Sequence, residues 1–535
     1  MTRDPRAFLA LDLGAATSSV ALVGRVAGHW RLLGSLSCPS DISVEALVGA
    51  LVARSAAADP ELAAELGVDP TAAADIPRLV ARSAPPAAIG VVAASERSLA
   101  PLVAAAERSG WRVHAGSAER LDPLAMSRLL LDPTISTVLA GAGDPPGADE
   151  RSALPELAAL VAGVGQRRPE IGIVLAGALA EHQARFESHT ADGSGDLLLG
   201  PAPTAGTPPG SSLGELLGRL RAPGDDARRS IAVAIGSLAE GLDRRIEVLD
   251  VGIDGGLRVV AAPGGPDEPA RVVSAAVARA ALAPEDVEDA VDGALGWATV
   301  STDRHRTRDR LRELRLSPWS GVSGDGAAFR MAAARAALGR LVAATPDLDA
   351  MSAPDLVVVA GGAWQVAPGP AIALAVADIV RRPGVTQVAF DHARLLAPLG
   401  TIEAAAERRG MLADLADDLL APLGTVVMPQ GLRGGRSGGR LVVHGQTGTS
   451  ELDLAAGGLE LVDLPPGESA MAEFQFRDAV RLGARGRHFA VDVAGGLGGL
   501  IVDLRDVPLR LPERADRRRE LLAAWQGALW PGMDE

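Results

Sequence analysis

The sequence lacks three residue types, which narrows the chemistry that it can support. It has no lysine, no asparagine and no tyrosine, so all 52 of its basic residues are arginine. Without lysine there is no Schiff-base amine and no lysine contact to a phosphate, and any cationic role falls to arginine. The single cysteine, Cys38, excludes a disulfide framework and a cysteine-based zinc site. No two of the eight histidines have the i, i+4 spacing of a metal-binding pair.

The chain also has no net positive charge and no long run of apolar residues. Its net charge of −15 argues against a nucleic-acid partner, which would need a basic face. No uninterrupted apolar stretch is long enough to span a membrane. Arg3 and Arg6 precede a strand-like segment without the cleavage pattern of a signal peptide. These absences predict a cytoplasmic protein with no membrane span.

The 535 residues are too many for one ordinary hydrophobic core, so several domains are expected. Residues 1–86 begin with a glycine-punctuated β-meander and continue into alanine-rich helices. Residues 87–186 alternate short strands with helices, which predicts a parallel sheet. Residues 187–228 are of low complexity and predict a linker or surface loop. Residues 229–423 are again mixed α/β, and residues 424–535 predict an all-β domain with a short terminal helix.

Two hairpin-like stretches share one pattern. Residues 10–23 read "ALDLGAATSSVALV" and residues 247–261 read "EVLDVGIDGGLRVVA", so that Asp12-Leu-Gly14 aligns with Asp250-Val-Gly252. A turn of small residues exposes successive backbone N–H groups, which can bind an anion. An aspartate at the end of the preceding strand can hold Mg²⁺ or polarise a water molecule. Each stretch alone is equally compatible with a buried hairpin that has glycine at its turn.

A third stretch, "DLVVVAGGAW" (355–364), is an apolar strand that ends in Gly361-Gly362. A glycine pair allows the backbone to approach a base or ribose closely. The alternative is an ordinary strand–Gly-Gly–helix turn.

The order of the three stretches resembles the phosphate 1, phosphate 2 and adenosine elements of the actin, Hsp70 and sugar-kinase ATPase superfamily. Within it the chain resembles the glutamate mutase L family along nearly its whole length. That resemblance is carried by residues 138–163, 354–402, 420–431 and 493–512.

The resemblance implies an α/β protein with two ribonuclease-H-like lobes (the actin-like ATPase fold), an inserted α/β region and a C-terminal all-β domain. Residues 1–86 would form the first lobe and residues 229–423 the second. It further implies ATP or ADP with Mg²⁺ as cofactors, and Asp12 and Asp250 as catalytic and metal-binding residues. The implied nucleotide-binding residues are Asp12, Gly14, Ala15, Thr17, Gly252, Asp254, Gly255, Gly361 and Gly362.

By the same resemblance, the chain would be an ATP-dependent accessory protein or reactivating chaperone of an adenosylcobalamin-dependent mutase. Relatives usually carry Gly, Ser or Thr where this chain has Ala15, and small residues with a Thr pair where its second hairpin continues with Ile253-Asp254-Gly255-Gly256-Leu257. Missing hydroxyls imply weak ATPase activity or none, and Asp254 would either bind metal or repel phosphate. Two alternatives therefore stay open: a scaffold that binds nucleotide or mutase subunits without hydrolysis, and a small-molecule kinase.

Two further segments have open interpretations. The arginine-rich residues 302–315 form either a solvated helix with internal ion pairs or a docking patch for an anionic partner. Residues 514–530 place Leu521, Leu522, Trp525 and Leu529 on one helical face. That face either packs on the body of the protein or lies on a membrane surface.

Overall fold

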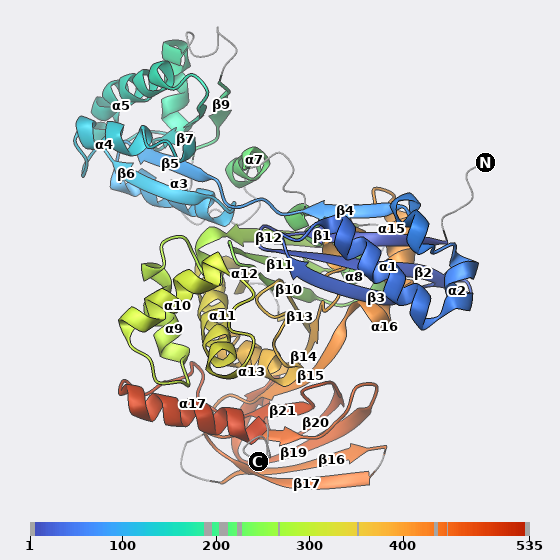
Figure 1. Cartoon of the computed structure of the whole chain (residues 1–535). Coiled ribbons are helices and arrows are strands. Elements are labelled where there is room, and N and C mark those ends of the chain that lie inside the picture. The colour runs from blue at the N-terminus through green and yellow to red at the C-terminus, as the bar shows by residue number, and fades with distance from the viewer. Residues whose placement is uncertain are drawn as a thin grey trace.

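The computed structural model describes residues 6–186, 195–202, 212–221, 227–265, 268–349, 353–432, 437–446 and 448–529. Within these residues the strands form four sheets. Figure 1 shows the N-terminal sheet beside the largest sheet, a separate α/β unit above them and the C-terminal strands below.

The N-terminal region is a four-stranded sheet covered by helices. Its elements are β1 (Ala7–Leu13), β2 (Thr17–Val26), β3 (His29–Pro39), α1 (Val44–Ala58), α2 (Pro60–Leu66), η1 (Pro70–Asp75) and β4 (Arg78–Arg82). The strand order is β3-β2-β1-β4; β1 is antiparallel to β2 and parallel to β4. The apolar strand β1 is buried along nearly its whole length, so the sheet needs cover on both faces. Helices α1 and α2 pack on one of them.

The largest sheet repeats this arrangement. Its first strands are β10 (Ile246–Val251), β11 (Gly256–Ala262), β12 (Arg271–Val277), β13 (Leu356–Ala360) and β14 (Gly384–Phe390). The order β12-β11-β10-β13 matches β3-β2-β1-β4, with the same strand directions: β10 is antiparallel to β11 and parallel to β13. The two stretches with a common sequence pattern therefore occupy equivalent places in two sheets.

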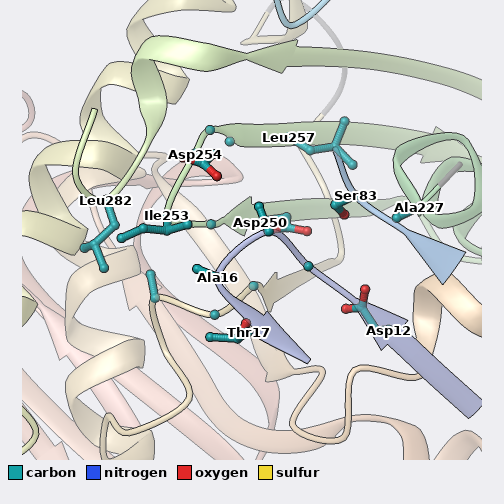
Figure 2. Close-up of a pocket in the computed structure, with 18 of the residues that line it drawn as sticks. Asp12, Ala16, Thr17, Ser83, Ala227, Asp250, Ile253, Asp254, Leu257 and Leu282 are labelled. Carbon is teal, nitrogen blue, oxygen red and sulfur yellow. The ribbon is translucent and has the colours of Figure 1, made fainter. Parts of the chain in front are cut away.

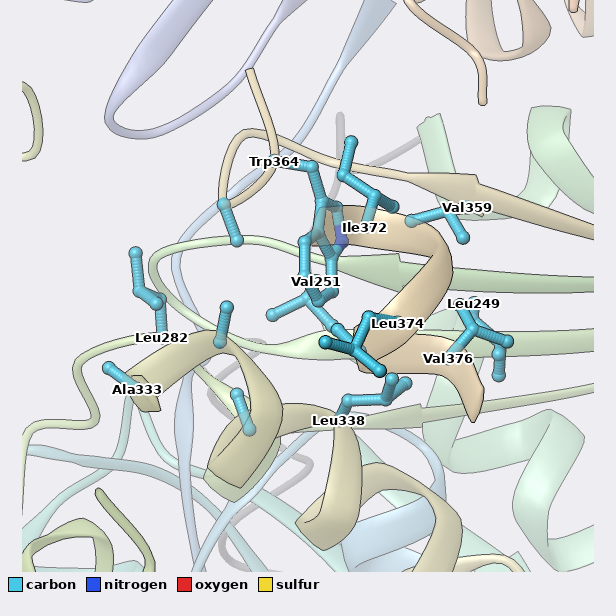
Figure 3. Packing of buried hydrophobic residues seen from close by; sticks show 14 of the residues in the cluster. Leu249, Val251, Leu282, Ala333, Leu338, Val359, Trp364, Ile372, Leu374 and Val376 are labelled. Atoms are coloured by element: carbon cyan, nitrogen blue, oxygen red, sulfur yellow. The ribbon is translucent and has the colours of Figure 1, made fainter. Parts of the chain in front are cut away.

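Helices bury both faces of the largest sheet. Trp364 lies at the centre of the apolar cluster on one face (Figure 3). The helices associated with that cluster are η3 (Ala278–Ala280), α9 (Glu288–Trp297), α10 (Arg304–Leu316), α11 (Gly324–Ala344) and α13 (Gly369–Ile379), and α12 (Pro346–Asp349) follows α11. The other face is covered by α8 (Ala227–Leu242), α14 (Leu396–Gly400), α15 (Ala405–Asp414) and α16 (Ala416–Leu419). The second cluster also contains Phe8 and Val23 of the first sheet, so one core joins the two sheets.

Between these sheets in the sequence lies a five-stranded, wholly parallel sheet with the order β6-β5-β7-β8-β9. Its elements are β5 (Ala88–Ala93), α3 (Glu96–Arg108), β6 (Arg112–Ser117), α4 (Pro123–Leu130), β7 (Ile135–Gly141), α5 (Ala148–Arg167), β8 (Gly172–Ala176), η2 (Gly177–Phe186), β9 (Leu197–Gly200) and α7 (Ser212–Leu220). β9 and α7 fall within the stretch predicted as a linker. Leu213 and Leu217 of α7 are buried against this sheet, which explains the difference. Residues 187–194, 203–211 and 222–226 of that stretch lie outside the described residues.

The C-terminal segment is rich in β-structure and shares a sheet with the preceding region. β15 (Ala421–Met428), β18 (Leu459–Val462) and β21 (Leu500–Asp503) extend the largest sheet beyond β14. β16 (Ser437–Gly445), β17 (Gly448–Ala455), β19 (Ser469–Leu482) and β20 (Ala484–Ala494) form a sheet of their own that packs on this extension. The expected boundary at residue 424 therefore falls inside strand β15.

The terminal helix α17 (Ala515–Leu529) packs on the body of the protein. Leu522, Trp525 and Leu529 are buried in the same cluster as Trp364. This favours the packing interpretation of residues 514–530. Among the described residues, no helix combines the length and the apolar character needed to cross a bilayer.

The arginine-rich helix α10 forms ion pairs with the neighbouring helix α9. Arg304 pairs with Glu288 of α9 at 3.2 Å and also with Asp292, and Arg308 pairs with the same Glu288. Exposed pairs of this kind contribute little stability each. The contacts favour the solvated-helix interpretation of residues 302–315.

Candidate functional site

The two hairpin turns have the same geometry. In the first, the Gly14 N–H donates a hydrogen bond to the Thr17 carbonyl at 2.9 Å; in the second, the Gly252 N–H donates to the Gly255 carbonyl at 2.8 Å. In each hairpin the aspartate lies two residues before the first glycine, near the end of the incoming strand. The likeness of the two sequences therefore extends to the backbone hydrogen bonding of their turns.

One cavity brings every predicted site residue together, with a volume of about 90 Å³. Figure 2 shows Asp12 and Thr17 of the first hairpin opposite Asp250 and Asp254 of the second. The predicted residues in its wall are Asp12, Gly14, Ala15, Thr17, Asp250, Gly252, Asp254, Gly255, Gly361 and Gly362. Residues from three distant parts of the sequence thus form a single site.

The glycine pair after β13 lies where that strand meets both hairpins. Gly361 has φ +98°, and a Cβ atom there would lie 2.3 Å from Asp250 Oδ1 and 2.4 Å from the Val251 carbonyl oxygen. A Cβ on Gly362 would lie 3.0 Å from Thr17 Oγ1. Only glycine fits at Gly361, because both the backbone conformation and the lack of space exclude a side chain.

Three arginines that the sequence did not single out also line the cavity: Arg228, Arg330 and Arg394. Arg330 donates to the Gly362 carbonyl at 3.1 Å and so supports the turn after β13. Arg228 lies at the start of α8, beside the second hairpin. The absence of lysine predicts that cations at the site are arginines, but nothing in the local sequence indicates which of the 52 they are.

Burial shifts the pKa values of charged groups in and around the cavity. Burial raises the pKa of Asp250 to about 6; the nearby Asp12 adds to this rise, while Arg394 and Arg228 oppose it. Burial likewise raises the pKa of Asp391 to about 7, against hydrogen bonds from the backbone N–H groups of residues 395 and 396. Burial lowers the pKa of the Arg228 guanidinium to about 10. Charges in such a water-poor site interact strongly.

The carboxylates suit a metal ion that arrives with a phosphate ligand. Within the described stretches, no group of three or more His, Cys, Asp or Glu side chains could hold a metal ion. Mg²⁺ is commonly bound by one or two carboxylates together with phosphate oxygens and water. Asp12 and Asp250 fit this role, and no hydrogen-bond donor of the described residues contacts the Asp250 carboxylate. Asp12 is ion-paired to Arg394 at 2.6 Å and Asp254 to Arg315 at 3.4 Å, so a metal ion at either carboxylate would compete with an arginine.

Comparisons with known proteins identify no family. No protein-family model and no curated protein matches the sequence. Among solved structures, a nucleotide-free acetone carboxylase is 9% identical with a TM-score of 0.28, covering 83% of this chain and 80% of that one. A Ppx/GppA phosphatase of Aquifex aeolicus is 8% identical with a TM-score of 0.20, covering 71% and 76%. A chain of the PilM–PilN type IV pilus biogenesis complex is 13% identical with a TM-score of 0.22, covering 76% and 98%. TM-scores this low do not establish a shared fold, so the function is inferred from the site itself.

Proposed function

We propose that this chain binds ATP or ADP together with Mg²⁺ between its two hairpins, as an actin-like nucleotide-binding protein. The observation that carries the proposal is the pair of equivalent D-x-G turns that line one cavity with the Gly361-Gly362 turn. The repeated order β3-β2-β1-β4 and β12-β11-β10-β13 supports two ribonuclease-H-like lobes, one for each hairpin. Two facing turns would bind a chain of phosphates from both sides.

The proposal gives distinct roles to the aspartates and to the glycines of the site. Backbone N–H groups of the turns at Gly14 and Gly252 would bind phosphate oxygens. Asp12 and Asp250 would hold Mg²⁺, which neutralises phosphate charge when bound. Gly361 and Gly362 would allow the adenosine moiety to approach the backbone closely.

Hydrolysis is expected to be slow or absent. Asp250 is the residue that would orient an attacking water molecule. Ala15 and Ile253, at the tips of the two turns, carry no hydroxyl to help position that water. These observations favour the alternative of a scaffold that binds nucleotide without turnover.

Mg·ATP or Mg·ADP is expected to stabilise the protein against unfolding. Ligand at about 100 times its Kd adds about 2.7 kcal/mol to the free energy of unfolding. Asp250→Ala should abolish this gain because it removes a metal-binding carboxylate. Thermal unfolding of both proteins, with and without each Mg²⁺–nucleotide complex, measures the effect.

The control variant is Asp492→Ala, which removes an exposed carboxylate on β20. It should retain the full gain in stability. A wild-type protein that neither complex stabilises would contradict nucleotide binding. Phosphate release assayed on the same samples separates the scaffold from an ATPase, because turnover that Asp250→Ala abolishes is incompatible with a scaffold.

A second cavity is the place where a small-molecule kinase would bind its substrate. It has a volume of about 430 Å³ and adjoins the first one at the tips of both turns. Asp41 and Asp254 lie in its wall and could accept a proton from a hydroxyl group of a small substrate. Phosphoryl transfer to added polyols, in place of phosphate release to water, would support this alternative.

We also propose, on the sequence resemblance alone, that the partner is a subunit of an adenosylcobalamin-dependent mutase. The blocks at residues 354–402 and 493–512 support this partner. Nucleotide-dependent lobe movement could then act on the mutase. Co-purification with such a mutase, compared with and without Mg·ATP, tests the partner separately from nucleotide binding.

A further inference from the structure

Arg394 is held in a conformation that is costly for its residue type. Its φ is +55°, in the left-handed region that residues with a Cβ seldom adopt. The turn around it is fixed by Asp391, whose carboxylate accepts hydrogen bonds from the Leu395 and Leu396 N–H groups at 2.9 Å and 3.2 Å. Such a conformation persists only where the surrounding structure imposes it, and it often marks a functional position.

This turn directs the guanidinium of Arg394 onto the first hairpin. Nη2 lies 2.6 Å from Asp12 Oδ2, and Nη1 donates to Thr17 Oγ1 at 2.7 Å. The side chain is only 9% exposed, in the wall of the cavity. Arg394 follows β14 of the largest sheet, whereas Asp12 and Thr17 belong to the first sheet. The contact therefore joins the two halves of the site.

A bare metal ion and Arg394 would compete for Asp12. A divalent cation beside an ion-paired guanidinium adds positive charge to positive charge in a water-poor cavity, where repulsion is strong. A metal–nucleotide complex also brings anionic phosphate oxygens. A guanidinium binds such oxygens well, with two parallel hydrogen bonds.

The other arginines of the cavity are placed differently. Arg330 donates to backbone carbonyls, including those of Gly362 and Pro318. Arg228 lies beside Gly255 of the second hairpin. Arg394, by contrast, is ion-paired to Asp12, a proposed metal-binding carboxylate.

We propose that Arg394 is a positioning residue that makes metal binding at Asp12 conditional on a phosphate ligand. Without nucleotide, the guanidinium neutralises Asp12 and disfavours a bare divalent cation. When a metal–nucleotide complex binds, the guanidinium turns to the phosphate oxygens and Asp12 becomes available to the metal. This inference rests on the proposed function and adds a binding order, in which metal and nucleotide enter together.

The test measures two affinities in the full chain that should change in opposite directions. Mn²⁺ binding without nucleotide is followed by the electron paramagnetic resonance of the free ion, and Mg·ADP binding by calorimetry. Arg394→Met should bind Mn²⁺ alone about tenfold more tightly, because Asp12 is unmasked, and Mg·ADP about tenfold more weakly. Adding Asp12→Asn to Arg394→Met should cancel the gain in Mn²⁺ affinity.

Two further variants control for folding. Arg394→Lys keeps the positive charge and should change both affinities less than Arg394→Met does, so it tests the proposal even if the methionine variant fails to fold. Arg340→Met removes a half-buried arginine, which donates to the Arg279 and Ala281 carbonyls at 2.7 Å and does not line the cavity. It should match the wild type in both affinities.

The outcomes separate this inference from the proposed function. If Arg394→Met weakens both affinities together, or changes neither, the positioning role is wrong. If the wild type binds Mn²⁺ alone as tightly as Arg394→Met does, the conditional step is wrong. If the wild type binds neither Mg·ADP nor Mg·ATP, the proposed function fails, while the Mn²⁺ measurements still show whether Arg394 masks Asp12.

Discussion

Gly361→Ala is expected to abolish nucleotide binding and to lower the free energy of unfolding by about 3 kcal/mol or more. The new methyl group would lie 2.3 Å from Asp250 Oδ1 and 2.4 Å from the Val251 carbonyl oxygen. The Val251 carbonyl cannot yield cheaply, because Val251 belongs to strand β10 and its carbonyl accepts a hydrogen bond from the Ala363 N–H at 3.0 Å. The clash would therefore displace Asp250 from the second hairpin.

Gly431→Ala is a matched control for the backbone conformation. Gly431 has φ +102°, close to that of Gly361, but nothing lies within 4 Å of its added Cβ. This variant should lower the free energy of unfolding by only about 1 kcal/mol, the cost of the backbone conformation, and should keep full nucleotide affinity. Urea unfolding and titration with a fluorescent nucleotide measure both effects. Equal losses in the two variants would show that the contact with Asp250 is unimportant.

Arg505→Met is expected to lower the free energy of unfolding by about 3 kcal/mol. The Arg505 guanidinium is almost fully buried and pairs with Asp503 at 2.8 Å and with Asp378 at 2.7 Å. It also lies over the Trp525 ring, 4.4 Å from the ring centre. Without Arg505, the buried carboxylates of Asp378 and Asp503 each lose one of two arginine partners, and Arg335 and Arg381 remain beside them. Weakening a buried ion-pair network in this way is destabilising.

Arg514→Met is the corresponding surface control. Arg514 pairs with Asp516 at 2.8 Å, but both side chains are largely exposed. Its loss should cost less than about 1 kcal/mol. Chemical denaturation followed by tryptophan fluorescence compares the two variants. If Arg505→Met separates unfolding into two transitions, the C-terminal segment is an independent unit, contrary to the shared sheet.

The local features of this protein were predictable from its sequence. Strand, turn and strand depend on neighbouring residues, so "ALDLGAATSSVALV" and its counterpart at 247–261 predict two similar hairpins. The structure shows the same turn hydrogen bond in both. The absence of lysine likewise predicts that a cation at the site is an arginine.

Other features depend on pairings between distant residues, which no local pattern records. β15, β18 and β21 join the largest sheet because its edge is available to them, although their sequences read equally well as a separate β-domain. β9 and α7 form within a stretch of low-complexity sequence, because the parallel sheet offers an apolar surface on which they can pack.

The features of the site likewise include some that the local sequence predicts and some that it does not. The two aspartates and the glycines of the turns were predicted from local sequence, because close backbone approach and strand-end carboxylates are local requirements. The contact between Arg394 and Asp12 has no local signal, because the two residues lie 382 positions apart in the sequence and meet only where two sheets share one core. Burial in the cavity that the folded chain forms is also what raises the pKa of Asp250 to about 6. The ion pair at Asp12 and the raised pKa of Asp250 thus depend on burial that only the folded chain provides.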